Sequence, residues 1–255
     1  MLTFDCVIIK HCSEMSKNKM WLKKSIFINP LIAFYFFVGF IAFIAEFKGD
    51  SFFVDLTKAL LIPLLLSLYW LSTKSKDIAY IVSLFLSWLA TVFFVSGVDS
   101  YWIIGTILFI LSHLAVIYVV IKNVRNPGWS FMILCSLPFI GLYLLGFVIS
   151  YNKLGVYFSL CMVEGVFMIF YGSLCLTNYM TKITYSSTYL LGSAVLSIFT
   201  HLLLIINGLV VKNLFLKSLA ILFFIIGQFS FYRYMFIEDQ NKRQKRYKII
   251  NDSSF

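Results

Sequence analysis

Hydrophobic residues fill this chain in eight long stretches that are separated by short polar links. Each stretch has about 20 mostly apolar residues, the length that an α-helix needs to cross the roughly 30 Å hydrocarbon core of a bilayer. The pattern predicts eight transmembrane helices, at residues 26–47, 52–73, 78–97, 100–121, 128–151, 154–176, 186–210 and 212–236. Because the links are short, we expect consecutive helices to run antiparallel, in an up-and-down bundle.

The composition agrees with this interpretation. Of the 255 residues, 61% are hydrophobic and 13% are charged, whereas a typical soluble domain has about 25% charged residues. We therefore expect an all-α, polytopic membrane protein with an N-terminal segment at 1–25, a transmembrane domain at 26–236 and a basic tail at 237–255. No link is long enough to hold a soluble domain, so a functional site is expected in the membrane or at its surface.

The basic residues predict the orientation of the bundle. The chain has 21 Lys and Arg residues and a formal net charge of +10, and most of the basic residues flank the helices on the side of the two termini. By the positive-inside rule both termini are predicted to be cytoplasmic. The basic run from Lys242 to Lys248 is then expected to face anionic lipid headgroups rather than nucleic acid. The small size and the lack of a clear signal-peptide cleavage site favour the bacterial inner (plasma) membrane.

Polar residues inside the predicted helices are the candidates for function. An ionisable group at the centre of a membrane helix costs about 2.5–3.5 kcal/mol even on the mildest scale, so such groups line a cavity or pair with another group. The polar residues of this kind are Lys58, Thr91, His113, Glu164, His201, Asn207 and Gln228.

Three of these side chains are candidates for proton transfer. Glu164 is the carboxylate that lies deepest in a predicted helix. It is expected to act as a general acid, or else to form a structural hydrogen bond or an ion pair with Lys58. His113 and His201 belong to the residue type that exchanges protons near neutral pH. The alternative for His113 is a structural hydrogen bond between helices, and the alternative for an unpaired His201 is a degenerate site. A Glu164–His201 pair would form an acid–base couple.

The other polar residues leave two interpretations open. Lys58 either extends to the membrane interface or binds a phosphate headgroup. Asn207 and Gln228 either hydrogen bond between helices or contact a ligand. The five cysteines have no metal-ligand spacing, and their odd number gives no disulfide framework. The sequence therefore predicts no metal site and no cofactor.

A faint internal repeat relates the third and seventh predicted helices. Ser83, Ser87 and Thr91 recur every four residues, and so do Ser193, Ser197 and His201. This spacing places each set on one helix face. The two sets would be related by a 4+4 repeat, an arrangement that occurs in transporters. The alternative is that small residues simply mark two packing faces.

Several short motifs resemble the YhhN-type lysoplasmalogenase family of eight-helix membrane proteins. That family typically has Ser-x-x-Gly-Asp in its third helix, Gly…Phe…His in its fourth, Lys-Pro in its second, Gly-Ala…Ser-Asp…Asn in its seventh and Ala-Gln in its last. The similar segments lie in the same order over about residues 56–230; they are Thr57-Lys58 with Pro63, Ser87 to Phe94, Trp102 to Gly105 with Phe109 and His113, Gly192 to Leu202 with Asn207, and Gly227-Gln228.

The resemblance implies hydrolysis of the vinyl-ether bond of a lysophospholipid, but the family's two buried aspartates are replaced by Thr91 and His201. Two buried carboxyl groups suit this reaction because it needs both an acid and a base. We expect a divergent hydrolase that acts on the vinyl-ether or ether bond of a single-chain lysophospholipid. His113, Glu164 and His201 are its expected catalytic residues. The expected substrate-cavity residues are Lys58, Ser87, Thr91, Asn207 and Gln228.

Two other functions stay open from the sequence. The protein is a catalytically inactive relative that binds lipid or a partner protein, or it is a small transporter. Membrane lipid is the expected partner of a hydrolase and of an inactive relative. No nucleic-acid partner is expected for any of the three functions. A transporter would fit the repeat, although Pro30, Pro63, Pro127 and Pro138 do not recur at matched positions.

Overall fold

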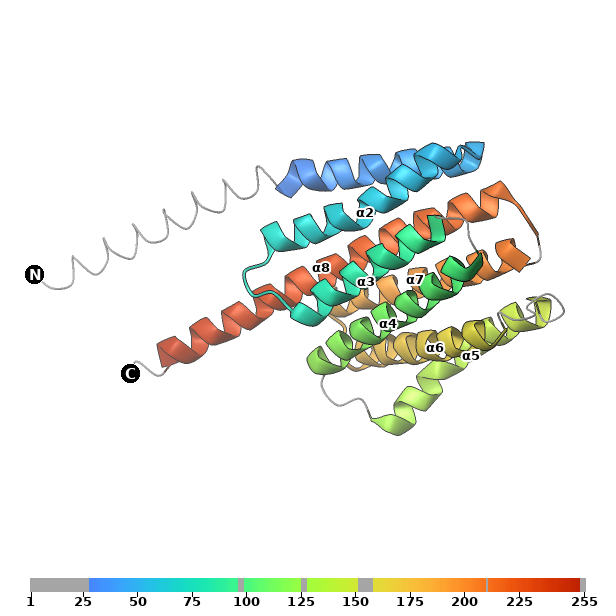
Figure 1. The fold of residues 1–255 in the computed structure, drawn as a ribbon. Helices are drawn as coiled ribbons and strands as arrows, with labels where there is room; N and C mark the ends of the chain where they lie inside the picture. The colour runs from blue at the N-terminus through green and yellow to red at the C-terminus, as the bar shows by residue number, and fades with distance from the viewer. Residues whose placement is uncertain (1–27, 96–98, 125–127, 151–157, 210, 253–255) are drawn as a thin grey trace, which may run out of the picture.

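The computed structural model describes residues 28–95, 99–124, 128–150, 158–209 and 211–252 (Figure 1), and within them the chain forms eight helices and no strand. These are the first helix (Ile28–Lys48), α2 (Ser51–Ser72), α3 (Ile78–Val95), α4 (Asp99–Asn123), α5 (Trp129–Ser150), α6 (Phe158–Thr181), α7 (Tyr185–Leu209) and α8 (Leu214–Asp252). The predicted all-α bundle is confirmed.

The helices form the bundle of a multi-pass integral membrane protein. In the described residues, seven helices are long and apolar enough to cross a membrane, and α3 is a shorter apolar helix. Large apolar side chains such as Phe37, Phe40, Ile133 and Val148 are more than half exposed on its outside. Such a surface is stable in lipid and would aggregate in water. The predicted multi-pass membrane architecture is therefore confirmed.

Tight turns between the helices set their antiparallel order. Gly49, between the first helix and α2, has a φ of 73°, a conformation that side chains other than glycine rarely adopt. Asp50 then caps α2, because its side chain accepts a hydrogen bond from the Phe53 backbone N–H at 3.4 Å. The first helix and α2 are thus joined by two residues.

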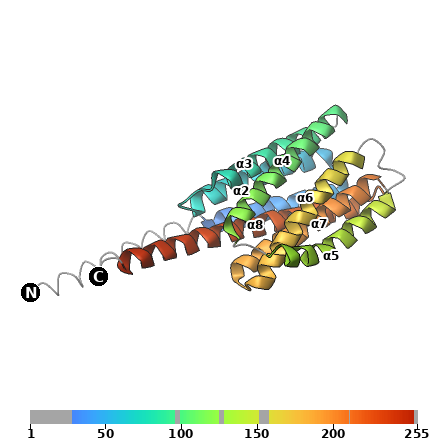
Figure 2. The same ribbon diagram turned by 90° about the horizontal axis from the view of Figure 1, so that it is seen from below.

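The last helix is longer than the sequence predicted. Its predicted end was residue 236, but α8 continues to Asp252 and its C-terminal part extends beyond the rest of the bundle (Figures 1 and 2). Hydropathy marks where the bilayer ends and not where the helix ends. The part after residue 236 has no Gly or Pro, and Asp239 and Arg243 form an ion pair one turn apart. The described part of the basic tail is therefore a continuation of a transmembrane helix.

A polar clamp ties this extension to the turn between α2 and α3. Asp239 is buried, and its carboxylate accepts hydrogen bonds from the Lys74 backbone N–H at 3.2 Å and from the Ser75 hydroxyl at 2.5 Å. Lys242 donates to the Asn123 side chain at the end of α4 at 2.7 Å. The extension is thus anchored where it leaves the bundle.

The sixth helix also ends several residues later than the sequence predicted. The sixth helix was predicted to end at residue 176, but α6 continues to Thr181. The hydroxyls of Thr177 and Thr181 donate to backbone carbonyls one turn back and are satisfied inside the helix. Polar residues of this kind lower the hydropathy of the segment without ending the helix. The link between α6 and α7 is therefore only residues 182–184.

Candidate functional site

The short turn between α6 and α7 brings Glu164 and His201 to the same level of the bundle. Glu164 lies in the first third of α6, and His201 lies in the last third of α7. The two residues are almost equally far from the turn at 182–184. Since both helices rise about 1.5 Å per residue, their side chains meet deep in the bundle. The Nδ1 atom of His201 lies 3.0 Å from Oε1 of Glu164.

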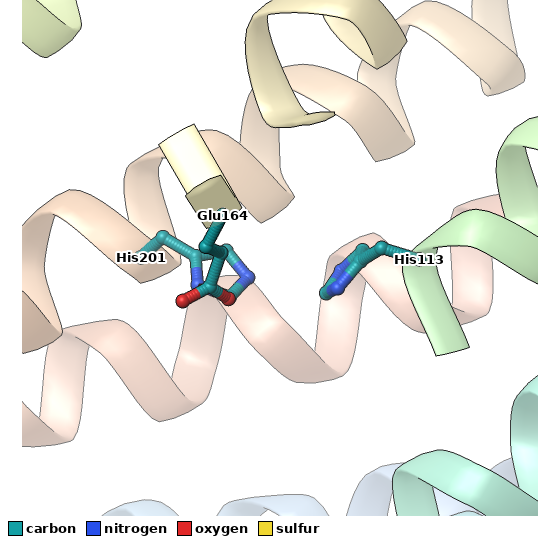
Figure 3. A group of neighbouring side chains, drawn as sticks. All are labelled: His113, Glu164 and His201. Carbon is teal, nitrogen blue, oxygen red and sulfur yellow. The ribbon is translucent and has the colours of Figure 1, made fainter. Parts of the chain in front are cut away.

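His113 completes a three-residue cluster from the middle of α4. The ring centroids of His113 and His201 are 5.2 Å apart, with the rings at 75° to each other. Each of His113, Glu164 and His201 offers one possible ligand atom, and these three atoms lie within 4.8 Å of one another. Figure 3 shows the Glu164 carboxylate beside the His201 ring, with the His113 ring pointing toward both. We call these three residues the His–Glu–His cluster.

Backbone and ring contacts of Phe109 orient the two histidines. Nδ1 of His113 lies 2.9 Å from the Phe109 carbonyl oxygen. A carbonyl only accepts hydrogen bonds, so Nδ1 carries the proton and Nε2 of the neutral ring keeps its lone pair. The Phe109 ring packs against His113 at 4.6 Å and His201 at 5.2 Å between centroids. Phe109 therefore fixes the tautomer of one ring and supplies an apolar wall to both.

Glu164 has an unsatisfied oxygen inside this cluster. Its Oε1 atom is buried and has no hydrogen-bond partner, although His201 Nδ1 lies within ion-pair distance. The two atoms are close, but they do not have the geometry of a hydrogen bond. Leaving a buried polar atom without a partner costs about 1–3 kcal/mol. A hydrogen-bond donor or a bound cation would satisfy this oxygen.

Tyr143 is a neighbour that the sequence did not single out. It lies on α5 and packs on α6 so closely that a Cβ added at Gly165, next to Glu164, would lie 3.2 Å from its ring. Its buried hydroxyl also has no hydrogen-bond partner. No local motif marks this tyrosine, because only the packing of α5 on α6 brings it to Glu164. It is a further candidate for the site.

The structure does not bring Ser87 and Thr91 into the cluster. The Ser87 hydroxyl lies 2.6 Å from the Ser112 hydroxyl on α4. The Thr91 hydroxyl donates to the Ser87 backbone carbonyl at 2.9 Å. Ser87 therefore serves the contact between α3 and α4, whereas the Thr91 hydroxyl is satisfied within α3. Ser112, which precedes His113, escaped sequence analysis because a single serine in an apolar helix carries no signal.

Lys58 pairs with Glu46 and not with Glu164. Its Nζ lies 2.9 Å from one Glu46 oxygen, and Lys217 Nζ lies 2.5 Å from the other. Glu46 is 2% exposed, whereas the lysine side chains are 27% and 42% exposed. The suggested ion pair between Glu164 and Lys58 is therefore wrong. Sequence cannot identify such partners, because Glu46 and Lys217 meet Lys58 only when the first helix, α2 and α8 pack together.

Asn207 and Gln228 occupy different surroundings. The Asn207 side chain accepts a hydrogen bond from the Asn213 backbone N–H at 2.8 Å, which closes the turn between α7 and α8. It also lines a cavity of about 280 Å³ with Lys212 and Lys217. Gln228 is half-buried in the middle of α8, and no hydrogen bond of its side chain is found among the described residues.

A larger cavity lies at the other end of α7. Its volume is about 570 Å³, and its lining includes Asn178, Ser186, Glu238 and Lys245. These residues surround the turn between α6 and α7, whereas the smaller cavity adjoins the turn between α7 and α8. The larger cavity is therefore remote from the His–Glu–His cluster along the bundle.

The fold and the site together define a multi-pass helical membrane protein with a buried cluster of two histidines and one glutamate. Comparison with known proteins gives no match, since no family model, no curated protein and no solved structure is similar to the chain. The function must therefore be argued from the side chains themselves.

Proposed function

We propose that this protein is a divergent YhhN/lysoplasmalogenase-like hydrolase that cleaves the vinyl-ether or ether bond of a single-chain lysophospholipid inside the membrane. The observation that carries the proposal is the Glu164–His201 contact at 3.0 Å, with His113 beside it. Two groups that exchange a proton, held together at membrane depth, are what an acid–base hydrolysis needs.

The reaction on a vinyl ether requires one proton donor and one activated water. A proton is added to the carbon of the C=C bond that is not attached to oxygen, which leaves a positive charge on the carbon attached to oxygen. Water attacks that carbon and gives up a proton, and the resulting hemiacetal breaks into a fatty aldehyde and the free glycerol hydroxyl. The proton that the acid supplies is recovered from the water, so the cycle needs no cofactor.

The three side chains divide these tasks. Glu164 and His201 share one proton, so the pair carries no net charge and is tolerated in an apolar bundle. This pair supplies the proton to the vinyl ether. The free Nε2 lone pair of His113, fixed by the hydrogen bond of Nδ1 to Phe109, takes the proton from the attacking water.

The smaller cavity is a suitable place for the phosphate headgroup. It is lined by Lys212 and Lys217 beside Asn207 and Asn213. The six residues from His201 to Asn207 correspond to about 9 Å along the axis of α7. A headgroup bound there places the first atoms of the lipid chain toward the level of the His–Glu–His cluster. In this proposal Lys217 takes the phosphate-binding role that the sequence gave to Lys58.

The proposal is tested by aldehyde release from lysoplasmalogen by the purified protein in lipid nanodiscs. Glu164→Gln keeps the shape of the side chain and removes the exchangeable proton, so we expect turnover to fall by about 100-fold or more. Glu238→Gln is the matched control. This glutamate accepts a hydrogen bond from Ser186 at the other end of the bundle, and its change is expected to leave turnover nearly intact.

The outcome separates the alternatives. Equal turnover by the unchanged protein and Glu164→Gln would contradict the proposed site. No turnover in the unchanged protein, with lysophospholipid still bound, would favour a lipid-binding relative. Proton-driven uptake into proteoliposomes without hydrolysis would favour a transporter.

A further inference from the structure

The His–Glu–His cluster also has the donor set of a metal site. Two imidazoles and one carboxylate are the protein ligands of several catalytic zinc centres and of mononuclear iron centres. The three donor atoms come from α4, α6 and α7 and lie within 4.8 Å of one another. We propose that His113, Glu164 and His201 bind a divalent transition-metal cation such as Zn²⁺, with one coordination position open.

The distances are close to those of a bound state. Ligands at about 2.1 Å from a tetrahedral zinc lie roughly 3.4 Å from one another. His201 Nδ1 and Glu164 Oε1, at 3.0 Å, are already in that range. His113 approaches from the opposite side, as its ring orientation in Figure 3 shows. Its donor atom lies within 4.8 Å of the other two and must move closer to complete three contacts.

The unsatisfied Glu164 oxygen is a second observation that a bound cation would explain. Glu164 Oε1 is buried beside His201 Nδ1 without forming a hydrogen bond. Two such atoms at this distance need a positive charge between them, and that charge is either the proton of the acid–base pair or a bound cation. The cation would satisfy the orphaned oxygen and neutralise the carboxylate in the apolar bundle.

The tautomer of His113 fits the same role. Metal-binding histidines almost always donate their other ring N–H to a carbonyl or carboxylate, which fixes the ring and raises its basicity. Nδ1 of His113 lies 2.9 Å from the Phe109 carbonyl, so Nε2 is the free ligand atom. The Phe109 ring, packed on both histidines, limits the access of water to the site.

A bound cation would occupy the His113 Nε2 lone pair and the Glu164 carboxylate that the proposed hydrolysis uses for proton transfer. The metal site therefore stands without that proposal, and its test measures binding. The purified full-length protein, stripped with a chelator, is titrated with ZnCl₂ by calorimetry and with CoCl₂ by visible absorption. We expect one equivalent of Zn²⁺ and a Co²⁺ spectrum of nitrogen and oxygen ligands without a thiolate charge-transfer band. A thiolate band would assign the metal to cysteine and overturn the proposal.

Single substitutions locate the site. We expect Glu164→Gln and His201→Asn each to weaken Zn²⁺ binding by about 100-fold or more, since even outer partners of metal ligands are worth 10–100-fold. Glu238→Gln, the control, should bind like the unchanged protein. Unchanged stoichiometry and affinity in Glu164→Gln or His201→Asn would overturn the proposal, as would no binding by the unchanged protein.

A second readout covers a variant that folds poorly. Zn²⁺ that binds only the folded state raises its thermal stability. We expect an increase in the melting temperature of the unchanged protein and of Glu238→Gln, and none in Glu164→Gln. An equal increase in all three would show that Zn²⁺ binds elsewhere. Since aldehyde release is not measured here, failure of the hydrolase proposal leaves these results interpretable.

Discussion

Within each of the helix pairs α3–α4 and α7–α8, the two helices approach each other closely at corresponding positions, but with different side chains there. In α3–α4 the Ser112 hydroxyl donates to the Ser83 carbonyl at 2.9 Å. In α7–α8 the matching place is taken by Gly227, where a Cβ would lie 3.6 Å from the Ser193 carbonyl oxygen. Ser83 and Ser193 are the first members of the two small-residue sets, so the contacts begin at equivalent points.

The equivalence continues two turns further along. A Cβ added at Gly105 on α4 would lie 3.2 Å from the Ala90 carbonyl oxygen on α3. In the other pair the Thr200 hydroxyl lies 3.4 Å from the Ala220 carbonyl oxygen. Small side chains let both pairs of backbones approach closely. These contacts agree with the 4+4 repeat, which stays a prediction.

The two pairs differ in chemistry at the level of the site. His113 follows Ser112, and Gln228 follows Gly227 at the equivalent place. On the facing helices the equivalent residues are Thr91 and His201. Among the residues that the structure describes, two histidines and a glutamate therefore gather on the side of the bundle where α4, α6 and α7 meet. A shared packing scheme does not determine chemistry; single side chains do so.

The largest expected effect separates His201 from its counterpart Thr91. His201→Ala removes a member of the Glu164 pair, and we expect aldehyde release to fall by about 100-fold or more. Thr91→Ala removes one hydroxyl that bonds to its own helix, and we expect a decrease of less than about fivefold. The rates of aldehyde release by the two variants are measured in nanodiscs and compared with that of the unchanged protein. Similar decreases in the two variants would contradict the difference proposed between His201 and Thr91.

The next effect concerns how closely α7 and α8 pack. A Cβ at Gly227 would lie 3.2 Å from the Leu196 Cβ and near the backbone of α7, so the branches of Gly227→Val have no room. Overpacking of this kind costs about 1–3 kcal/mol in the free energy of unfolding. The free energy of unfolding of this variant is measured by denaturation in mixed micelles.

Gly141→Val is the control for this change. Nothing lies within 4 Å of a Cβ at Gly141, which is also in a transmembrane helix. The difference between the two variants therefore isolates packing from the intrinsic effect of replacing glycine. Equal stabilities would mean that α7 and α8 can separate without cost.

The sequence predicted the helices well because bilayer thickness imposes a length on every apolar stretch. It also identified His113, Glu164 and His201, because ionisable residues inside such stretches are few and costly. Their meeting follows in part from the sequence, since the short link between α6 and α7 sets Glu164 and His201 at one level. The packing of α4 against α6 and α7, which brings His113 to the other two residues, cannot be predicted from a local sequence pattern.

The unpredicted features depend on contacts between distant segments. Glu46 lies near a predicted helix end and gave no sign that it would be buried between Lys58 and Lys217. Tyr143 is one of 15 tyrosines, and only its packing beside Gly165 distinguishes it. The end of α8 was missed for a different reason, because a helix that leaves the bilayer becomes polar without ceasing to be a helix.

The smallest expected effect tests whether the hydroxyl that distinguishes α3–α4 stabilises that pair. Ser112→Ala removes the link to the Ser83 carbonyl and to the Ser87 hydroxyl and makes α3–α4 resemble α7–α8. Hydrogen bonds between membrane helices average about 0.6 kcal/mol and reach about 1.7 kcal/mol, so we expect a loss of about 1 kcal/mol. Ser136→Ala, whose exposed hydroxyl bonds only to its own helix, is the matched control. A loss in Ser112→Ala no larger than in the control would mean that close backbone packing alone, as at Gly227, holds both pairs together.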